Sequence, residues 1–215
     1  MTHMTPTPDA HDTVRQAPNT QADRERSLAL ALPNLLTYGR LAAVPLLAAC
    51  LYFWDGPNGR FVAAAIFALA SLTDFLDGYL ARIWEQQSNM GRMLDPIADK
   101  LLVSVTLLML IADGTISELA LWAALIILAR EIVVSGLREF LAELNVKLHV
   151  SWLAKWKTVV QMLALFVLLI GPTAAGDLLS GFDAVTLGIG LLWMSAVLTI
   201  YTGWDYLLAA LKHVG

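Results

Sequence analysis

Long apolar runs alternate with short polar breaks from residue 28 to the end of the chain. A helix needs about 20 mostly apolar residues to cross the hydrocarbon core of a bilayer. Six runs meet this need, and they cover approximately Leu35 to Trp54, Phe61 to Leu80, Met93 to Ala112, Ile116 to Leu137, Leu153 to Ile170 and Ala184 to Leu208. The breaks WDGPNGR, ADGT and GPTAAGDLLSGFD contain residues that end helices and form turns. The pattern therefore predicts an all-α integral membrane protein with six transmembrane helices.

The chain before the first predicted span divides into two parts. Residues 1–27 are polar and contain no apolar run that could form the core of a signal peptide, so we expect a disordered tail. The next segment, LALALPNLL, has an apolar stripe and a proline near its expected helix start, which predicts a short helix lying in the membrane interface. We therefore expect a tail over 1–27 and one six-helix domain over 28–215.

Composition points to the same environment. Hydrophobic residues make up 58% of the chain, charged residues 15%, and the mean hydropathy is +0.65. The apolar share of soluble domains is nearer to about 45–50%. The single cysteine, Cys50, lies in an apolar run, so we predict no disulfide framework. The net charge of −4 gives no reason to expect a nucleic-acid partner.

Basic residues fall unevenly on the two sides of the predicted spans. With a cytoplasmic N-terminus, Arg60 alone lies in an outer loop, whereas ten basic residues lie on the inner side: Arg15, Arg24, Arg26, Arg82, Arg92, Arg138, Lys147, Lys155, Lys157 and Lys212. The remaining three, Arg40, Lys100 and Arg130, fall within spans close to the same side. Because cytoplasmic loops carry the excess of Lys and Arg, we expect both termini in the cytoplasm.

Four aspartates interrupt the apolar pattern at helical spacing. Asp74 and Asp77 are three residues apart near the inner end of the second span, and Asp95 and Asp99 are four apart at the start of the third. Each pair shares a helix face, and a short loop makes the two helices antiparallel neighbours, so the pairs can meet. Four carboxylates at a membrane edge repel one another unless positive charge lies among them. The spacing predicts a site for divalent cations.

All-oxygen ligands without histidine or cysteine favour Mg²⁺ or Mn²⁺. Two such ions with shared carboxylates suit displacement at phosphorus. Gly78 would let a ligand approach the helix backbone, and Arg82 lies on the same face, where a guanidinium can hold a phosphate. In the alternative interpretation, an aspartate here is a solvated cap or the partner of an arginine. Asp95 precedes Pro96, so helix capping could be its whole role.

These residues together resemble the signature of the CDP-alcohol phosphotransferases. The pattern D-x-x-D-G-x-x-A-R, then eight residues and G-x-x-x-D-x-x-x-D, is filled at Asp74, Asp77, Gly78, Ala81, Arg82, Gly91, Asp95 and Asp99. The resemblance implies a six-span membrane enzyme, usually a homodimer, that moves a phosphatidyl group from a CDP-linked lipid to an alcohol and releases CMP. It also implies two divalent cations.

The resemblance assigns a role to each of these residues. It implies that Asp74, Asp77 and Asp95 bind metal, and that Asp99 binds metal and serves as the base. It places CDP-lipid contacts at Gly78, Ala81, Arg82, Ser88 and Gly91. The segment PNLLT, with Asn34 and Thr37, resembles the lining of the nucleotide pocket in members of the family.

Basic residues in the second half of the chain suit an anionic acceptor. Arg130 and Arg138 are eight residues apart on one face of the fourth span, and Lys155 and Lys157 open the fifth. Cations beside a carboxylate site favour a phosphorylated polyol over a neutral one. In the alternative interpretation these residues are membrane-surface anchors, which suits Lys155 best of the four. We expect Glu131 to pair with a local cation.

The motif R-E-x-x-V-S-x-x-R, followed by S-W-x-x-K-x-K-T-x-x-Q, narrows the resemblance to bacterial members that use sn-glycerol 3-phosphate and CDP-diacylglycerol in the inner membrane. Family members that form cardiolipin or use inositol phosphate would share the donor site and differ at the acceptor. A divalent-cation transporter could also place acids in a membrane. Transporters typically show internal repeats and midplane ligands, whereas these aspartates lie at one surface.

Overall fold

The computed structural model of the protein describes the backbone of residues 32–84, 89–144, 152–173 and 183–214. Side chains are described in these ranges except at 32–33, 75–84, 89–92, 143, 154, 205 and 209–214. All regular structure in the described part is helical. The helices are α2 (Leu32–Phe53), α3 (Pro57–Trp84), α4 (Asn89–Ala112), α5 (Ala120–Glu143), α6 (Trp152–Ile170), the short 3₁₀ helix η1 (Gly171–Thr173) and α7 (Ala184–Val214).

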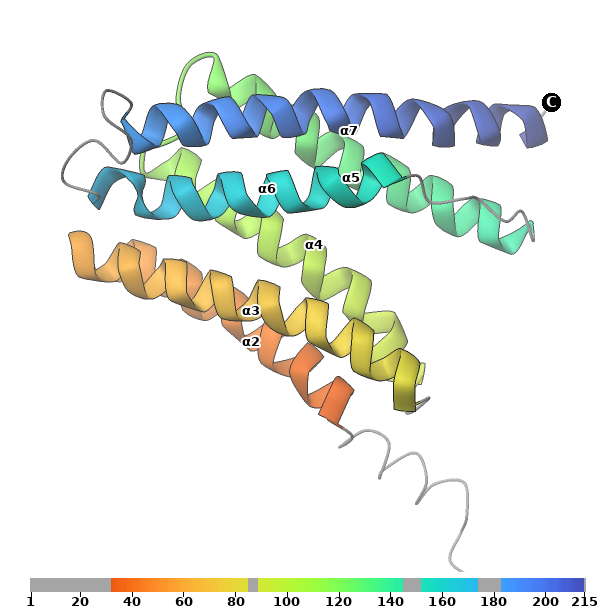
Figure 1. The fold of residues 1–215 in the computed structure, drawn as a ribbon, viewed down its shortest axis with the longest axis horizontal. Coiled ribbons are helices and arrows are strands. Elements are labelled where there is room, and N and C mark those ends of the chain that lie inside the picture. Colours follow the sequence, from red (N-terminus) through yellow and green to blue (C-terminus); the bar gives the residue numbers. More distant parts are fainter. Residues whose placement is uncertain (1–31, 85–88, 145–151, 174–182, 215) are drawn as a thin grey trace, which may run out of the picture.

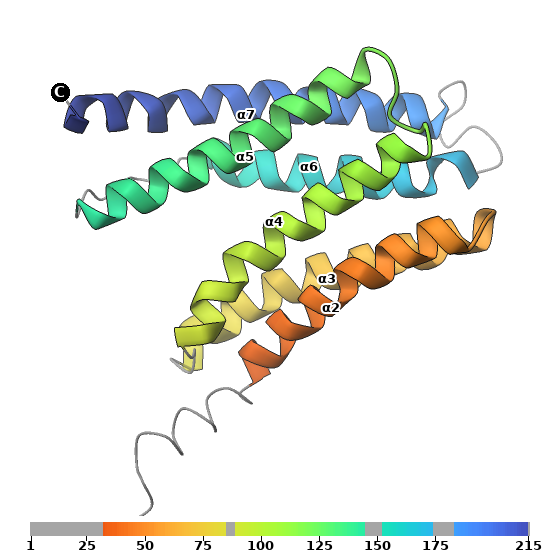
Figure 2. The same ribbon diagram turned by 180° about the vertical axis from the view of Figure 1, so that it is seen from behind.

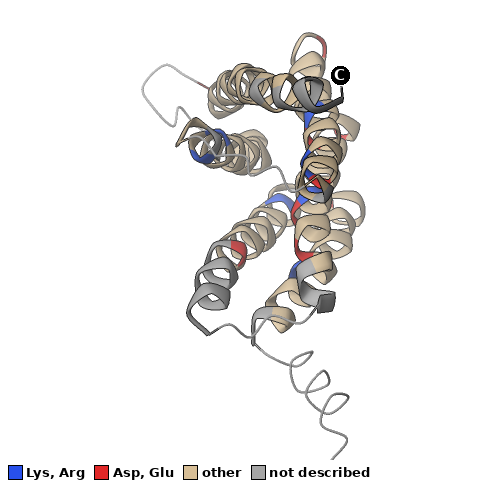
Figure 3. Cartoon of the chain, turned by 90° about the vertical axis from the view of Figure 1, so that its right-hand side faces the viewer, with Lys and Arg blue, Asp and Glu red and all other residues tan. Residues whose placement is uncertain are grey.

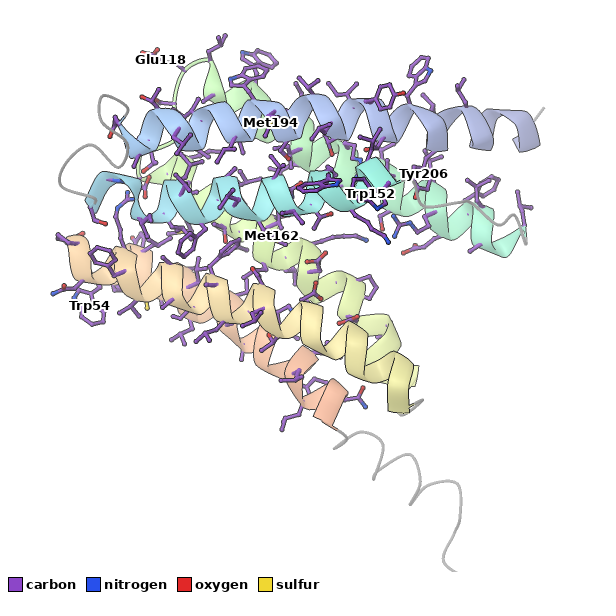
Figure 4. The ribbon with its side chains drawn as sticks, viewed as in Figure 1. Trp54, Glu118, Trp152, Met162, Met194 and Tyr206 are labelled. Atoms are coloured by element: carbon purple, nitrogen blue, oxygen red, sulfur yellow. The ribbon has the colours of Figure 1, made fainter. Side chains whose placement is uncertain are left out.

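Successive long helices run in opposite directions through the bundle (Figure 1). The starts of α2, α4 and α6 lie at the same end as the last turns of α3, α5 and α7. Trp54 and Glu118 mark the opposite end, where α2 ends and α5 is about to begin (Figure 4). The acidic pairs therefore lie at one end of the bundle, because α3 ends there and α4 starts there.

Two groups of three helices make up the bundle. Within the first, α2 packs along α3 and against α4, and within the second, α7 packs along α6 and against α5. The groups meet through α3 with α6 and through α4 with both α5 and α6. Seen from behind, α4 crosses between the two groups (Figure 2). We call α2–α4 the first half and α5–α7 the second half.

The core is built from leucine and alanine, and the small residues allow close helix packing. Ala63, Ala64, Ala123, Ala124 and Ala164 are all buried in one cluster with leucines from α2, α4, α6 and α7. Small residues at helix contacts let backbones approach, which is how helices associate where no water drives them together. Large apolar side chains meanwhile point outward over much of the surface, as expected for a protein surrounded by lipid.

Within the described residues, four helical segments are long and apolar enough to cross a membrane: Asn34–Phe53, Ala120–Ala142, Lys155–Thr173 and Ala184–Leu208. The expectation of an all-helical membrane protein is thus confirmed at this coarser level. Helices α3 and α4 are of similar length, with 28 and 24 residues. The segment LALALPNLL was predicted to form a short interfacial helix of its own. From Leu32 onward it belongs instead to α2. Residues 1–31 lie outside the described part.

A closed polar cluster joins three elements at the end remote from the acidic pairs, and we call it the Arg60 cluster. Arg60 Nη2 donates to Asp113 Oδ2 at 2.5 Å and to Thr115 Oγ1 at 2.9 Å, and Nη1 donates to the Leu169 carbonyl at 3.4 Å. Asp113 Oδ1 accepts the Thr115 amide at 2.9 Å. The predicted turn ADGT is present here, and Gly114 adopts φ +78°, a conformation that glycine takes without strain. The cluster ties α3, the α4–α5 turn and α6 together.

Candidate active site

Arg40 organises the acidic end of the first half. Its Nη1 lies 2.5 Å from Asp74 Oδ1 on α3 and 3.1 Å from Asp95 Oδ1 on α4. The guanidinium side chain is 0% exposed. Because one nitrogen contacts both carboxylates, the two oxygens cannot be farther apart than the sum of those distances. The structure therefore brings together one aspartate from each predicted pair, and we call Arg40, Asp74, Asp95 and Asp99 the aspartate cluster.

The N-terminal part of α2 contributes polar side chains to the same place. Thr37 Oγ1 donates to Asp95 Oδ1 at 3.4 Å, one turn before Arg40. Asn34, a further turn back, is fully buried. Positions 34, 37 and 40 recur at helical spacing, so they share one face of α2. Two residues predicted to line the nucleotide pocket thus lie on the helix face that reaches Asp95.

Asp99 connects the two halves electrostatically. It lies within electrostatic range of Asp74 and Arg40 in the first half and of Glu131 and Lys157 in the second. Its Oδ1 atom is buried and has no hydrogen-bond partner in the described part of the protein. A buried carboxylate oxygen without a donor is costly, so this atom is suited to bind a proton or a ligand.

A second charged cluster lies opposite, in the second half, and we call Arg130, Glu131 and Lys157 the Glu131 cluster. Lys157 Nζ donates to Glu131 Oε1, and Arg130 Nη1 donates to the same oxygen at 3.3 Å. The expected pairing of Glu131 with a local cation is confirmed. Arg130 Nη2 also donates to Thr202 Oγ1 on α7 at 3.2 Å. In Figure 3, several acidic and basic residues follow one another through the centre of the view.

Arg138 and Lys155, the other two residues predicted to bind the anionic acceptor, lie outside the Glu131 cluster. Arg138 lies 5.6 Å from the centre of the Tyr206 ring, a distance typical of a cation–π contact. Lys155 is exposed whereas Lys157 is buried, because residues two apart point to opposite sides of a helix. Trp152 and Trp156 contact each other edge to face and are exposed near Lys155. Lys155 therefore lies on the outward face of α6. Arg138 is also exposed but contacts α7 through Tyr206, and Lys157 alone of the four is buried.

Several predicted site residues lie outside the described side chains: Asp77, Gly78, Ala81, Arg82, Ser88 and Gly91. Asp77, Gly78, Ala81 and Arg82 belong to the last turns of α3, and Gly91 to the first turn of α4. The capping alternative for Asp95 is wrong, because α4 begins at Asn89 and both Asp95 and Pro96 lie inside it. The other alternative, an aspartate paired with arginine, describes Asp74 and Asp95 correctly.

Sequence reasoning missed two residues that the structure places at the site. Arg40 sits inside an apolar span, and a charge buried in a span requires a partner, which is the signal that could have found it. Lys100 follows Asp99 and donates to Ser135 Oγ on α5. Both contacts join residues 35 or more positions apart, so no local spacing reveals them.

The aspartate cluster has the chemistry of a divalent-cation site. Its acidic side chains offer only oxygen atoms as metal ligands, and the buried Asp99 Oδ1 accepts no hydrogen bond in the described part. Among the described residues, no three His, Cys, Asp or Glu side chains are close enough together to hold a metal ion. The fourth aspartate of the motif, Asp77, is not among these side chains, and Arg40 lies between Asp74 and Asp95. The donor set fits Mg²⁺ or Mn²⁺.

Residues 30–201 match the CDP-alcohol phosphatidyltransferase family. This match covers most of the chain, and the chain belongs to that family. A relative from Rickettsia bellii, named CDP-diacylglycerol--glycerol-3-phosphate 3-phosphatidyltransferase, is 46% identical over 182 residues, which is 85% of this chain and 96% of the relative. The protein of this name in Cereibacter sphaeroides is 37% identical, over 86% of this chain and 97% of its own length. Form 2 from Arabidopsis thaliana is 42% identical, over 82% of this chain and 78% of its own length.

Proposed function

We propose that this protein transfers the phosphatidyl group of CDP-diacylglycerol to sn-glycerol 3-phosphate. The products are phosphatidylglycerol phosphate and CMP, and the reaction belongs to bacterial phospholipid synthesis. The observation that carries this proposal is the 46% identity, over 85% of the chain, to a relative whose name states this reaction. One of the motif aspartates, Asp99, lies within electrostatic range of Glu131 and Lys157, and this arrangement supports the proposal.

Asp74, Asp77, Asp95 and Asp99 are the residues that would hold two divalent cations, Mg²⁺ or Mn²⁺. When bound, such ions neutralise the diphosphate oxygens of the donor and stabilise the departing CMP. Arg40 keeps Asp74 and Asp95 close together, and Thr37 fixes Asp95 by a further hydrogen bond. These two α2 residues thereby orient carboxylates that would otherwise repel each other.

Asp99 is the base of the proposed reaction. Its carboxylate takes the proton of the acceptor hydroxyl, whose oxygen forms a bond to the lipid-side phosphorus, while the bond from that phosphorus to the CMP oxygen breaks. The unpartnered Oδ1 supports this role, because a base needs a free acceptor atom near the hydroxyl. The CDP portion would be held by Asn34, Thr37, Gly78, Ala81, Arg82, Ser88 and Gly91.

The acceptor phosphate would be held in the second half, by Arg130, Arg138, Lys155 and Lys157. The position of Asp99, within electrostatic range of Lys157, supports an acceptor that lies between the two halves. The exposed Lys155 would act at the rim, as an attracting charge, and the buried Lys157 within the pocket. A phosphate dianion needs this excess of positive charge, whereas a neutral polyol does not.

The proposed membrane arrangement has six spans, formed by α2 to α7. It has both termini in the cytoplasm, the active site facing the cytoplasm, and a tail over residues 1–27 before the catalytic domain. Helices α3 and α4, with 28 and 24 residues, are long enough to cross, and their ends carry the acids. We place the protein in the bacterial inner membrane as a homodimer.

Assays of the purified protein with CDP-diacylglycerol and one acceptor at a time test the function. Radiolabelled lipid product is expected with sn-glycerol 3-phosphate in the presence of Mg²⁺, and chelation with EDTA should abolish it. Product from phosphatidylglycerol or from inositol phosphate instead would reassign the acceptor. Divalent-cation uptake by liposomes containing the protein, without CMP release, would overturn the enzymatic proposal and favour transport.

A further inference from the structure

Glu131 occupies a central place between two cations that the proposed function assigns to the acceptor. One oxygen, Oε1, accepts both from Lys157 Nζ on α6 and from Arg130 Nη1 on the same helix as Glu131. The side chains of Lys157 and Glu131 are 6% and 21% exposed, so the contact is largely shielded from water. It therefore persists where a surface ion pair would be screened.

The physical effect of Glu131 follows from the charges around it. Arg130 and Lys157 lie beside the same oxygen, and without a negative charge they would repel each other in a poorly solvated place. A single carboxylate leaves the cluster with one net positive charge and holds both cations at a common point. Lys157 has three N–H donors and Glu131 accepts only one of them, so the ammonium retains donors for a ligand.

One further contact fixes Arg130, and electrostatic proximity links the cluster to the proposed base. Thr202 Oγ1 accepts from Arg130 Nη2, which ties the guanidinium to α7, and Gly203 permits the close approach there, since a Cβ at this position would lie 3.3 Å from Arg130 Cγ. On the other side, Asp99 lies within electrostatic range of both Glu131 and Lys157. The cluster thus lies close enough to the proposed base for its charges to act on it.

We propose that Glu131 is a positioning residue for the acceptor. It fixes Arg130 and Lys157 so that they hold the acceptor phosphate with the acceptor hydroxyl at Asp99, and it does so without touching the reacting atoms. This inference rests on the proposed function. A purely structural role, in which Glu131 only joins α5 to α6, would affect stability but would not distinguish one substrate from the other.

Steady-state kinetics of Glu131→Gln in the full-length protein separate these roles. Glutamine keeps the shape of the side chain and removes the charge. The apparent KM for sn-glycerol 3-phosphate should rise roughly 10- to 100-fold, the range expected when a hydrogen bond to a charged group is lost. The apparent KM for CDP-diacylglycerol should stay near the wild-type value. The matched control is Glu139→Gln, an exposed glutamate on the same helix, which should change neither KM.

A double-mutant cycle with Lys157→Gln tests whether Glu131 acts through that lysine. If it does, the two changes together should raise the acceptor KM by less than the product of the separate increases. Equal rises in both substrate KM values, or a lower melting temperature with both KM values unchanged, would overturn the inference.

Glu131→Asp covers the case in which the glutamine variant fails to fold. Aspartate keeps the charge but is one methylene shorter, so we expect a folded protein with a raised acceptor KM, and an unchanged acceptor KM would overturn the inference. Absence of product from sn-glycerol 3-phosphate in the wild type would instead overturn the proposed function. Normal wild-type activity combined with unaltered variants would overturn the positioning role alone.

Discussion

The Arg60 cluster and the aspartate cluster both contain an arginine 2.5 Å from an aspartate, yet they differ in charge balance. In the Arg60 cluster one guanidinium meets one carboxylate, and a hydroxyl, an amide and a carbonyl complete the hydrogen bonds. In the aspartate cluster one guanidinium contacts two carboxylates and lies within electrostatic range of a third, Asp99, whose Oδ1 has no partner in the described part. The balanced cluster is equipped for stability, and the unbalanced one for binding positive charge.

The two halves of the site are unbalanced in opposite directions. The aspartate cluster carries an excess of negative charge, and the Glu131 cluster carries an excess of positive charge. Such buried excess charge costs stability, so its presence in both halves points to ligands of opposite sign. Cations suit the first half, and an anionic substrate suits the second. This contrast with the Arg60 cluster yields three tests, which use matched substitutions at the two ends of the bundle.

The largest effect is expected from Asp99→Asn. The amide cannot take the acceptor proton, so kcat should fall by roughly 10²- to 10⁴-fold while binding of CDP-diacylglycerol is largely retained. CMP release and donor binding measure the two properties separately. The matched change at the other end, Asp113→Asn, should leave kcat unchanged. Wild-type turnover by Asp99→Asn would remove it as the base.

The next effect concerns stability and compares Arg40→Met with Arg60→Met. Loss of the buried Arg40 guanidinium leaves two partly exposed carboxylates, Asp74 and Asp95, at 36% and 29% exposure, without their shared partner. The free energy of unfolding should fall by about 2–4 kcal/mol, less than for a fully buried pair because water solvates the carboxylates in part. This corresponds to roughly 4–16 °C in melting temperature for a chain of this size. Arg60→Met should cost about 1–2 kcal/mol. Thermal unfolding in detergent measures both.

A cation control sharpens this second comparison. Added Mg²⁺ should restore more stability to Arg40→Met than to Arg60→Met, because only the former leaves carboxylates that lack positive charge. Equal destabilisation of the two variants, with no difference in their response to Mg²⁺, would show that the two clusters do not differ in the proposed way.

The smallest effect is expected from Thr115→Val. This change removes one hydrogen bond from Arg60 and preserves side-chain shape, so the free energy of unfolding should fall by about 0.5–1.5 kcal/mol. Both substrate KM values and kcat should remain at wild-type levels. A marked loss of turnover would indicate that the Arg60 cluster controls the geometry of the distant site, which a purely stabilising cluster does not do.

Local patterning predicted the helices well. The six apolar runs correspond to α2 through α7, and the ADGT break became a turn with Gly114 at positive φ. Helical spacing also predicted that Asp95 and Asp99 share one face of α4. The structure agrees, because Asp95 contacts Arg40 and Asp99 lies within its electrostatic range. These successes share one cause, because periodicity and turn chemistry are properties of neighbouring residues.

The tertiary partners could not be predicted in the same way. Arg40 meets Asp95 across 55 positions of sequence, and Lys100 meets Ser135 across 35. The anchor interpretation singled out Lys155, which is exposed, but the burial of Lys157 depends on how α6 packs and could not be predicted from sequence. The alternative in which Asp95 only caps a helix was wrong, because α4 begins at Asn89 and continues through Pro96.

Two residues of α4 that are five positions apart, Asp95 and Lys100, make contacts in different directions, and this constrains the axial rotation of the helix. Asp95 is attached to α2 through Arg40 and Thr37, while Lys100 is attached to Ser135 on α5. Turning α4 about its own axis would break one attachment or the other. Successive positions differ by about 100° around an α-helix. Inserting or deleting a single residue between Asp95 and Asp99 would therefore turn Asp99 away from the second half. The chemical identity of every motif residue would remain unchanged.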